Sequence, residues 1–432
     1  MNVKAIFITL IFVKLAVITA VSSPLPYQAK DKHLGVSSCA SSVCHGAVRP
    51  NESYDIGLNE YIIWAHHDLH ARAYQTLLTD DSKAIAKKLG LTDAHSAEIC
   101  LDCHSDHVPE EKRGKNFQLS DGVGCEACHG GAEKWIEGHA SKDVSYQKNV
   151  DHGMYPTVDM DKRNTLCLSC HYGNNDKFAT HRIMGAGHPR LSFELDTFLA
   201  LQPPHYELDD DYKKRKTVHD RTKQWALGQI AAARSQLEML QGPFIQKRQL
   251  FPELALFDCY ACHNNSTHQL NWRRRTNTIR SEPGSVPVND GHLRMVVVIA
   301  KQVDEHAAKQ ILVLCQSLQQ AVSATPRKVA NVSRQLGHMI NRIGDALGAA
   351  VYSESDKMQI LVNLIDMGIK GDYRDYIGAE QATMAIELIS IDIKKADKYR
   401  SHLDKLYGLL KKDEGYRPTQ FAKALSLLKA DL

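Results

Sequence analysis

The sequence of 432 residues predicts a mainly α-helical protein built in two parts. The first part, residues 30–290, has short helical patterns separated by long loops rich in Gly, Pro, Asp and Asn, and it holds five clusters of two cysteines and a histidine. The second part, residues 291–432, has apolar residues at helical spacing and none of these clusters, which is typical of a helical bundle. Hardly any segment alternates apolar and polar residues as a strand does.

Residues 1–23 are predicted to form a secretory signal peptide. An apolar run follows Lys4, and the small residues Ala20, Ser22 and Ser23 stand where cleavage would occur. The run falls short of the ~20 apolar residues that a spanning helix needs, and Lys14 interrupts it. An uncleaved anchor is therefore the less favoured alternative. Export would place the protein in the periplasm, with no stable membrane span after cleavage.

Four copies of Cys-x-x-Cys-His lie between residues 100 and 263, and a longer copy precedes them. This motif is the attachment site of a c-type haem. Two thiols form thioethers with the porphyrin vinyl groups, and the histidine binds the iron as an axial ligand. We therefore expect about five covalently bound haems c, stacked so that they form much of the interior of the first part. The cysteines are Cys39, Cys44, Cys100, Cys103, Cys125, Cys128, Cys167, Cys170, Cys259 and Cys262, and the motif histidines are His45, His104, His129, His171 and His263.

The first motif has four residues between Cys39 and Cys44 instead of two. Both thiols can still reach the vinyl groups if the extra residues bulge outward. His45 is followed by glycine, as in one of the regular motifs, which favours haem attachment here too. The alternatives are a disulfide between the two cysteines, or a haem that is bonded through Cys44 alone.

Each iron can take a second axial ligand. A second histidine gives a six-coordinate haem suited to electron transfer, whereas an open position lets the iron bind and reduce a small molecule. The best candidates are His70, on a predicted helix, His139, which closely follows the third motif, and His181 and His188, which flank a glycine-containing segment. The weaker candidates are His33, His107 and His268.

The domain boundaries follow from these patterns: a signal peptide, a multihaem domain at 30–290 and a haem-free helical bundle at 291–432. One longer helix, at 218–240, interrupts the loop-rich domain, and residues 280–289 have the Pro and Gly content of a linker. We expect five or six helices in the bundle. Cys315, the one cysteine outside the motifs, lies in an apolar helical pattern and is expected to be a buried thiol.

Charge excludes one class of partner. The 53 basic and 50 acidic residues nearly balance, with a net charge of +3, and this gives no case for nucleic-acid binding. Basic clusters at 213–216 and 273–275 could dock an acidic redox partner or pair with haem propionates, although a solvated surface is the simpler interpretation.

Several segments together carry a family resemblance: residues 64–74, 122–130, 181–189 and 257–263. They resemble the multihaem c-type cytochrome family that includes the tetrahaem electron acceptor of ammonia-oxidising bacteria and is distantly related to hydroxylamine oxidoreductase and the octahaem reductases. The resemblance implies closely packed haem pairs, mostly with two histidine ligands, and implies distal ligands at His70 and His139. It also allows one five-coordinate haem. The chain departs from the tetrahaem pattern in its five sites, its longer first motif and its C-terminal bundle.

The favoured function is a periplasmic electron carrier in a respiratory chain, including anaerobic respiration. Its expected partners are redox proteins, such as a quinol-oxidising cytochrome or a terminal reductase, and a homo-oligomer is left open. All five motifs end in histidine, whereas related reductases often have lysine at the active haem, and this favours the carrier.

The alternative is a terminal reductase of a small nitrogen or sulfur oxyanion (nitrite, hydroxylamine, tetrathionate or sulfite) at one open-coordinate haem. Its proton donors and cations would come from His66, His67, Arg72, His107, Arg182 and Arg190. A zinc or disulfide scaffold is a third interpretation, but adjacent Cys-Cys-His triads do not supply the paired ligand sets that close four-coordinate zinc sites.

Overall fold

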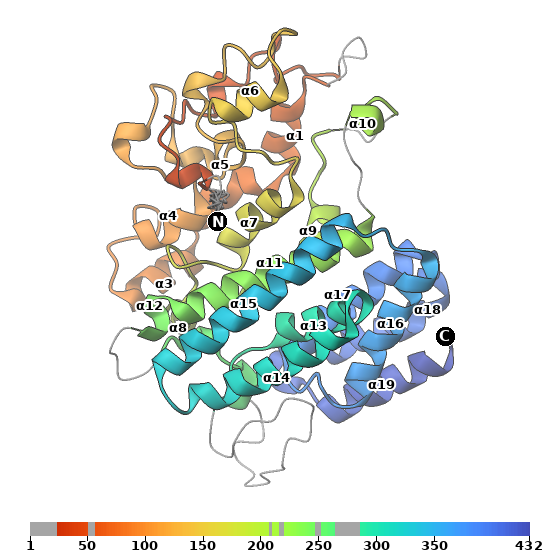
Figure 1. The fold of residues 1–432 in the computed structure, drawn as a ribbon. Coiled ribbons are helices and arrows are strands. Elements are labelled where there is room, and N and C mark those ends of the chain that lie inside the picture. The colour runs from red at the N-terminus through yellow and green to blue at the C-terminus, as the bar shows by residue number, and fades with distance from the viewer. Residues whose placement is uncertain (1–23, 51–56, 207–209, 216–219, 247–251, 264–285) are drawn as a thin grey trace, which may run out of the picture.

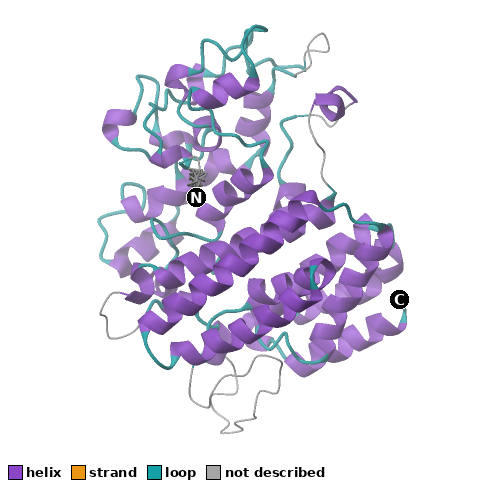
Figure 2. Cartoon of the chain, in the orientation of Figure 1, coloured by secondary structure: helices purple, strands orange, loops and turns teal. Residues whose placement is uncertain are grey.

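The computed structural model describes residues 24–50, 57–206, 210–215, 220–246, 252–263 and 286–432 (Figure 1). The predicted signal peptide, the basic cluster at 273–275 and His268 lie outside these residues. The mainly α-helical class is confirmed, because helices joined by loops make up the described part of the chain (Figure 2). Within it, the β pairing consists of two isolated bridges, His33 with Arg113 and Phe257 with Val288.

The first part consists of short helices whose ends are set by capping side chains and glycines. Thr79, for example, accepts a hydrogen bond from the backbone N–H of Ser82 at the start of α3, and Gly90 ends that helix with a φ of 74°. The short helices are α1 (Glu60–His67), α2 (Ala73–Thr76), α3 (Asp80–Leu89), α4 (Glu98–His104), α5 (Cys125–His129), α6 (Tyr146–Asp151), α7 (Met160–His171), α8 (His181–Ala186), α9 (Leu195–Leu201), α10 (Asp210–Arg215) and α12 (Pro243–Gln246).

The C-terminal part is a bundle of longer helices packed around one apolar core. In the described residues from 286 onward there are seven: α13 (Gly291–Val303), α14 (Glu305–Val322), α15 (Pro326–Ala349), α16 (Glu354–Ile369), α17 (Tyr376–Asp392), α18 (Ala396–Leu409) and α19 (Pro418–Ala430). Cys315 is buried in this core, as expected. No helix in the described part of the chain combines the length and the apolar character that crossing a bilayer requires.

The longest helix of the first part, α11 (Arg221–Gln241), lies between the two parts (Figure 1). On one side it packs against α7 and α9, and on the other against α13, α15 and α17. Trp225, Ile230 and Leu237 belong to the same apolar core as the bundle helices. On the opposite side Gly228 allows a close approach, since a Cβ there would lie 3.1 Å from Cβ of Leu195. The boundary at residue 290 stays a prediction, and α11 supplies part of the core on the far side of it.

Replacing Leu237 by Ala tests whether α11 is part of the bundle core. Leu237 is 1% exposed, so Leu237→Ala should lower the free energy of unfolding by about 2–5 kcal/mol. Urea unfolding followed by far-ultraviolet circular dichroism measures the change. Leu427 on α19 is 44% exposed, and Leu427→Ala should cost less than about 0.5 kcal/mol. Similar losses for the two variants would contradict this role of α11.

Candidate haem-binding sites

Each of the five motif histidines lies close to a second histidine from another part of the chain. The distances between ring centroids are 6.1 Å for His45 and His139, 6.3 Å for His104 and His188, 6.3 Å for His129 and His205, 5.9 Å for His171 and His70, and 6.2 Å for His263 and His181. An iron held between two imidazole nitrogens, with each bond about 2 Å long, places the ring centroids about 6 Å apart. The spacing of every pair therefore fits one haem iron with two histidine ligands.

The four best sequence candidates for second ligands, His70, His139, His181 and His188, each face a motif histidine. The fifth partner, His205, was missed. It follows two prolines just after α9, and this extended segment brings it to His129. The prolines were the local signal that could have drawn attention to it.

The weaker candidates have other partners. Nδ1 of His33 lies 2.8 Å from a carboxylate oxygen of Asp106, and Nδ1 of His107 lies 2.7 Å from one of Asp102. In the described residues neither imidazole is paired with a motif histidine.

Hydrogen bonds at Nδ1 leave Nε2 of several paired histidines for the metal. The acceptors are Glu60 for His45 (2.9 Å), Asp68 for His70 (2.8 Å), and the carbonyls of Ala73 for His104 (3.1 Å), Ile136 for His139 (2.6 Å) and Pro189 for His188 (2.7 Å). Histidines that bind metals usually donate the other ring N–H to a carboxylate or carbonyl, which fixes the tautomer and the ring orientation. The same pattern is present here.

Asp68 connects two of the pairs. It accepts hydrogen bonds from Nδ1 of His70 at 2.8 Å and from Nε2 of Gln202 at 3.0 Å, three residues before His205. Burial acts to raise the pKa of Asp68, but the hydrogen bonds with His70 and Gln202 outweigh it and lower the pKa to about 2. Asp68 therefore stays an anion that orients His70 and anchors the segment carrying His205.

The cysteine spacing follows from helical geometry. Three of the regular motifs form the last turns of α4, α5 and α7, and the fourth begins in a short 3₁₀-helix, Cys259–Ala261. Residues three apart on a helix share a face, so both thiols of a motif point to the same side. The histidine that follows ends each α-helix, where its ring is free to turn toward its partner.

Glu126, inside the third motif, fixes the segment that precedes the first motif. Its carboxylate accepts backbone N–H bonds from Leu34 at 2.8 Å, Gly35 at 2.7 Å and Ala132 at 2.7 Å. The side chain is almost fully buried, and burial raises its pKa while these backbone donors act to lower it. The first and third motifs are thereby held side by side.

Thiols from different motifs also meet. The Cys39 thiol lies beside that of Cys125, and the Cys103 thiol lies beside that of Cys170. Nζ of Lys177 lies 3.1 Å from Sγ of Cys170 and is also bound to the carbonyl of Asp102. The first motif thus lies beside the third, and the second lies beside the fourth.

Four of the six residues proposed as proton donors or cations for a reductase bind to other protein groups. Arg190 bridges Glu380 and Asp413, at 3.3 and 3.1 Å. Arg182 donates to the carbonyl of Leu89, Arg72 donates to that of His66, and His107 pairs with Asp102. His66 and His67 are exposed at the end of α1.

Comparison with protein families agrees with this chemistry. Residues 38–130, less than a quarter of the chain, match the family described as "Cytochrome c554 and c-prime", and this stretch holds the first three motifs. The match supports a multihaem c-type cytochrome. It also supports covalently bound haem c and a part in electron transfer for this cytochrome. Comparison with curated proteins and with solved structures gave no match.

Replacing His205 tests the ligand that the sequence did not reveal. His205→Ala should leave one iron of the cytochrome with an open position, because His129 would lose its partner. The electron paramagnetic resonance spectrum should gain a high-spin signal from one haem per chain, and the reduced protein should bind carbon monoxide. The control is His152→Ala, since His152 is exposed and faces no motif histidine in the described residues. An unchanged low-spin spectrum for His205→Ala would contradict the assignment.

Glu126→Ala should destabilise the cytochrome by several kcal/mol, because each buried donor left unpaired costs about 1–3 kcal/mol. Thermal unfolding followed by absorbance of the haem band measures the loss. Glu137 is exposed, and Glu137→Ala is the matched control with little expected change. Equal midpoints for the two variants would count against the role of Glu126.

Proposed function

We propose that this cytochrome is a periplasmic electron carrier with five haems c, each held by one Cys-Cys-His motif and one further histidine. The observation that carries the proposal is the set of five histidine pairs at 5.9–6.3 Å, since a second histidine at each iron leaves no position for a substrate. When bound, haem iron accepts and releases one electron. The protein supplies the ligands, the burial and the hydrogen bonds that set each potential.

The contacts between motifs support closely spaced sites. The first site adjoins the third through Cys39 and Cys125, and the second adjoins the fourth through Cys103 and Cys170. The third site is close to the fourth. Burial raises the pKa of the Cys128 thiol, and the nearby thiols of the fourth motif, Cys167 and Cys170, raise it further. The fifth site is close to the second, because His181 at the start of α8 faces His263 and His188, just after α8, faces His104.

Location and partners complete the proposal. Export by residues 1–23 would bring the chain to the outer side of the inner membrane, where covalent haem attachment takes place. The partners would be redox proteins, a quinol-oxidising cytochrome or a terminal reductase in a respiratory chain. The bundle would give these partners a docking surface or support a homo-oligomer.

The experiment is the electron paramagnetic resonance spectrum of the oxidised protein together with its intact mass. Five covalently attached haems and only low-spin signals are expected, because every iron would have two histidine ligands. A high-spin component that shifts when nitrite, sulfite or hydroxylamine is added would instead indicate an open iron and favour a reductase. A mass that corresponds to fewer haems would contradict the proposed count. The masses of proteolytic fragments would then show which motifs carry no haem.

A further inference from the structure

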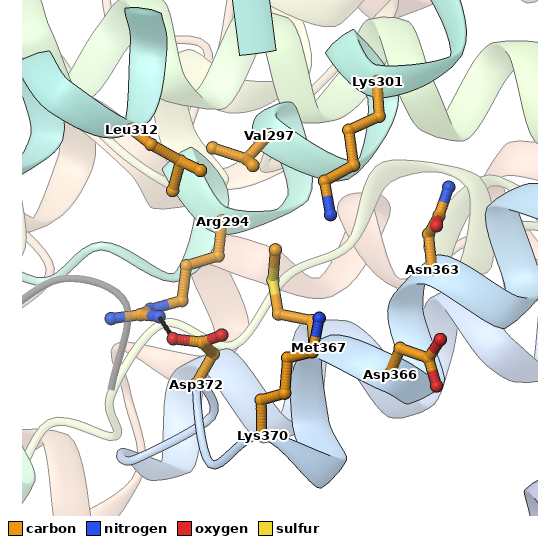
Figure 3. A pocket seen from close by; sticks show the side chains of 9 residues that line it. All are labelled: Arg294, Val297, Lys301, Leu312, Asn363, Asp366, Met367, Lys370 and Asp372. Carbon is orange, nitrogen blue, oxygen red and sulfur yellow. Dashed lines mark hydrogen bonds and ion pairs between the residues drawn. The ribbon is translucent and has the colours of Figure 1, made fainter. Parts of the chain in front are cut away.

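The bundle shows how this protein accommodates a buried cation. Arg294 is 1% exposed, and it binds Asp290 at 2.8 Å and Asp372 at 3.1 Å. The pair with Asp372 lies at the edge of a pocket lined by α13 and α16 (Figure 3). Arg190 binds Glu380 at 3.3 Å in the same way. A charge that is taken out of water is costly unless an opposite charge compensates it, and both arginines are compensated.

Lys177 is a cation of the first part for which the described residues provide no carboxylate partner. Its side chain is partly buried, in the segment between α7 and α8. Nζ donates to the backbone carbonyl of Asp102 at 2.9 Å and lies 3.1 Å from Sγ of Cys170. It also lies 4.3 Å from the centre of the Tyr27 ring. In the described part of the chain no carboxylate oxygen lies within ion-pair distance of this ammonium.

The carboxylates of two neighbouring residues are bound elsewhere. Asp176 accepts the hydroxyl of Tyr27 at 3.0 Å, and Oδ1 of Asp102 lies 2.7 Å from Nδ1 of His107. The ammonium of Lys177 is stabilised instead by a carbonyl oxygen and by the face of an aromatic ring. Both contacts favour the charged form of the lysine.

Tyr27 fixes the position of this ammonium. It lies in the 3₁₀-helix Pro26–Gln28, and its hydroxyl accepts a hydrogen bond from Nδ2 of Asn174 at 3.0 Å. Oδ1 of Asn174 in turn accepts the backbone N–H of Lys177 at 3.0 Å. The ring and the loop that carries Lys177 are therefore held together, and the charge stays in one place.

The fixed charge lies where two haem-binding motifs meet. Asp102 directly precedes Cys103 in the second motif, and Cys170 is the second cysteine of the fourth. Sγ of Cys170 lies 3.9 Å from the carbonyl oxygen of Asp102, so Lys177 contacts both motifs at once. A thioether at Cys170 would attach the vinyl edge of a porphyrin here. The propionates lie on the opposite edge of a haem, so those of the haem at Cys170 would point away from Lys177.

We propose that Lys177 raises the reduction potential of the haem bound by the fourth motif. This inference rests on the part of the proposed function that places a haem at this motif. A redox partner supplies one electron, ferric iron becomes ferrous, and the charge of the haem falls by one. A fixed positive charge nearby stabilises the reduced form. Lys177 binds no iron and exchanges no proton in this step.

The size of the effect follows from Coulomb's law. Over about 10 Å, at an effective dielectric constant of about 20, one unit charge changes the equilibrium between oxidised and reduced haem roughly tenfold. A tenfold change corresponds to about 59 mV for one electron. Because the five proposed sites have the same two ligand types, a change of this size shifts electrons toward the fourth site.

Spectroelectrochemical titration of the full haem-loaded chain tests the proposal. In Lys177→Gln the potential of one low-spin haem should fall by about 59 mV, the value for a tenfold change. Lys177→Arg keeps the charge and should keep the original potential. Lys328→Gln, at an exposed position on α15, removes the same charge where solvent screens it and should leave all potentials unchanged. His70→Met identifies the haem concerned, since His70 faces His171 and methionine ligation raises the potential.

Lys177→Met keeps the length of the apolar stem and repeats the comparison if glutamine disturbs the packing. Unchanged potentials in these uncharged variants, with five low-spin haems retained, would overturn the inference and leave the carrier intact. An equal fall in Lys177→Arg, or loss of the haem from both uncharged variants, would also overturn it, because the role would then be structural. If the intact mass of the unmodified chain lacks the haem of the fourth motif, the proposed function fails at that site instead.

Discussion

In each proposed site two imidazole rings must stand far enough apart to hold one haem iron between them. This spacing constrains the segments of the chain that surround the rings. Each ring must come from a segment that is fixed well enough to keep the spacing, and the partners are far apart in the chain: His70 with His171, and His45 with His139. The loops, helix caps and glycines of the first part let the chain turn often enough to bring such segments together. Its apolar clusters are small, with Leu77, Ala86, Ala94 and Leu101 in one of them. Bound haem would therefore contribute much of the stability of this part, as metal sites do in other domains with little core.

The C-terminal bundle differs from the first part in the size of its apolar core. Its core is large and apolar, and burial of these side chains stabilises it. The helix α11 lets the two parts share one frame, because it packs against α7 and α9 on one side and bundle helices on the other. The fifth motif is fixed to the same frame by Tyr260 and Asp258. Rigid support of this kind is what keeps ligand geometry and potential constant during electron transfer.

The sequence was informative where chemistry is local and silent where contacts are tertiary. Thioether attachment requires two cysteines and an adjacent histidine, so the motifs were visible in the sequence. His139 could be found because it closely follows a motif. His70 was found from a predicted helix, although α1 ends at His67 and His70 lies in the short 3₁₀-helix Leu69–Arg72. His205 was missed, since nothing near two prolines indicates which iron a histidine will reach. The position of α11 was equally hidden, because its apolar residues do not indicate which neighbours cover them.

The buried charges beside the fifth motif could not be predicted from the sequence for the same reason. Asp290 and Arg294 are a local pair four residues apart, but Asp258, Asp372 and Arg374 reach them from other segments. The five proposed sites share the same pair of ligand types, so differences between their potentials would come from burial, hydrogen bonds and nearby charge. In a low-dielectric interior a buried charge acts over several ångströms more strongly than it would at the surface. The ion pairs that Asp290 makes with Arg294 and Arg374 therefore place buried charges of the C-terminal bundle beside the fifth motif.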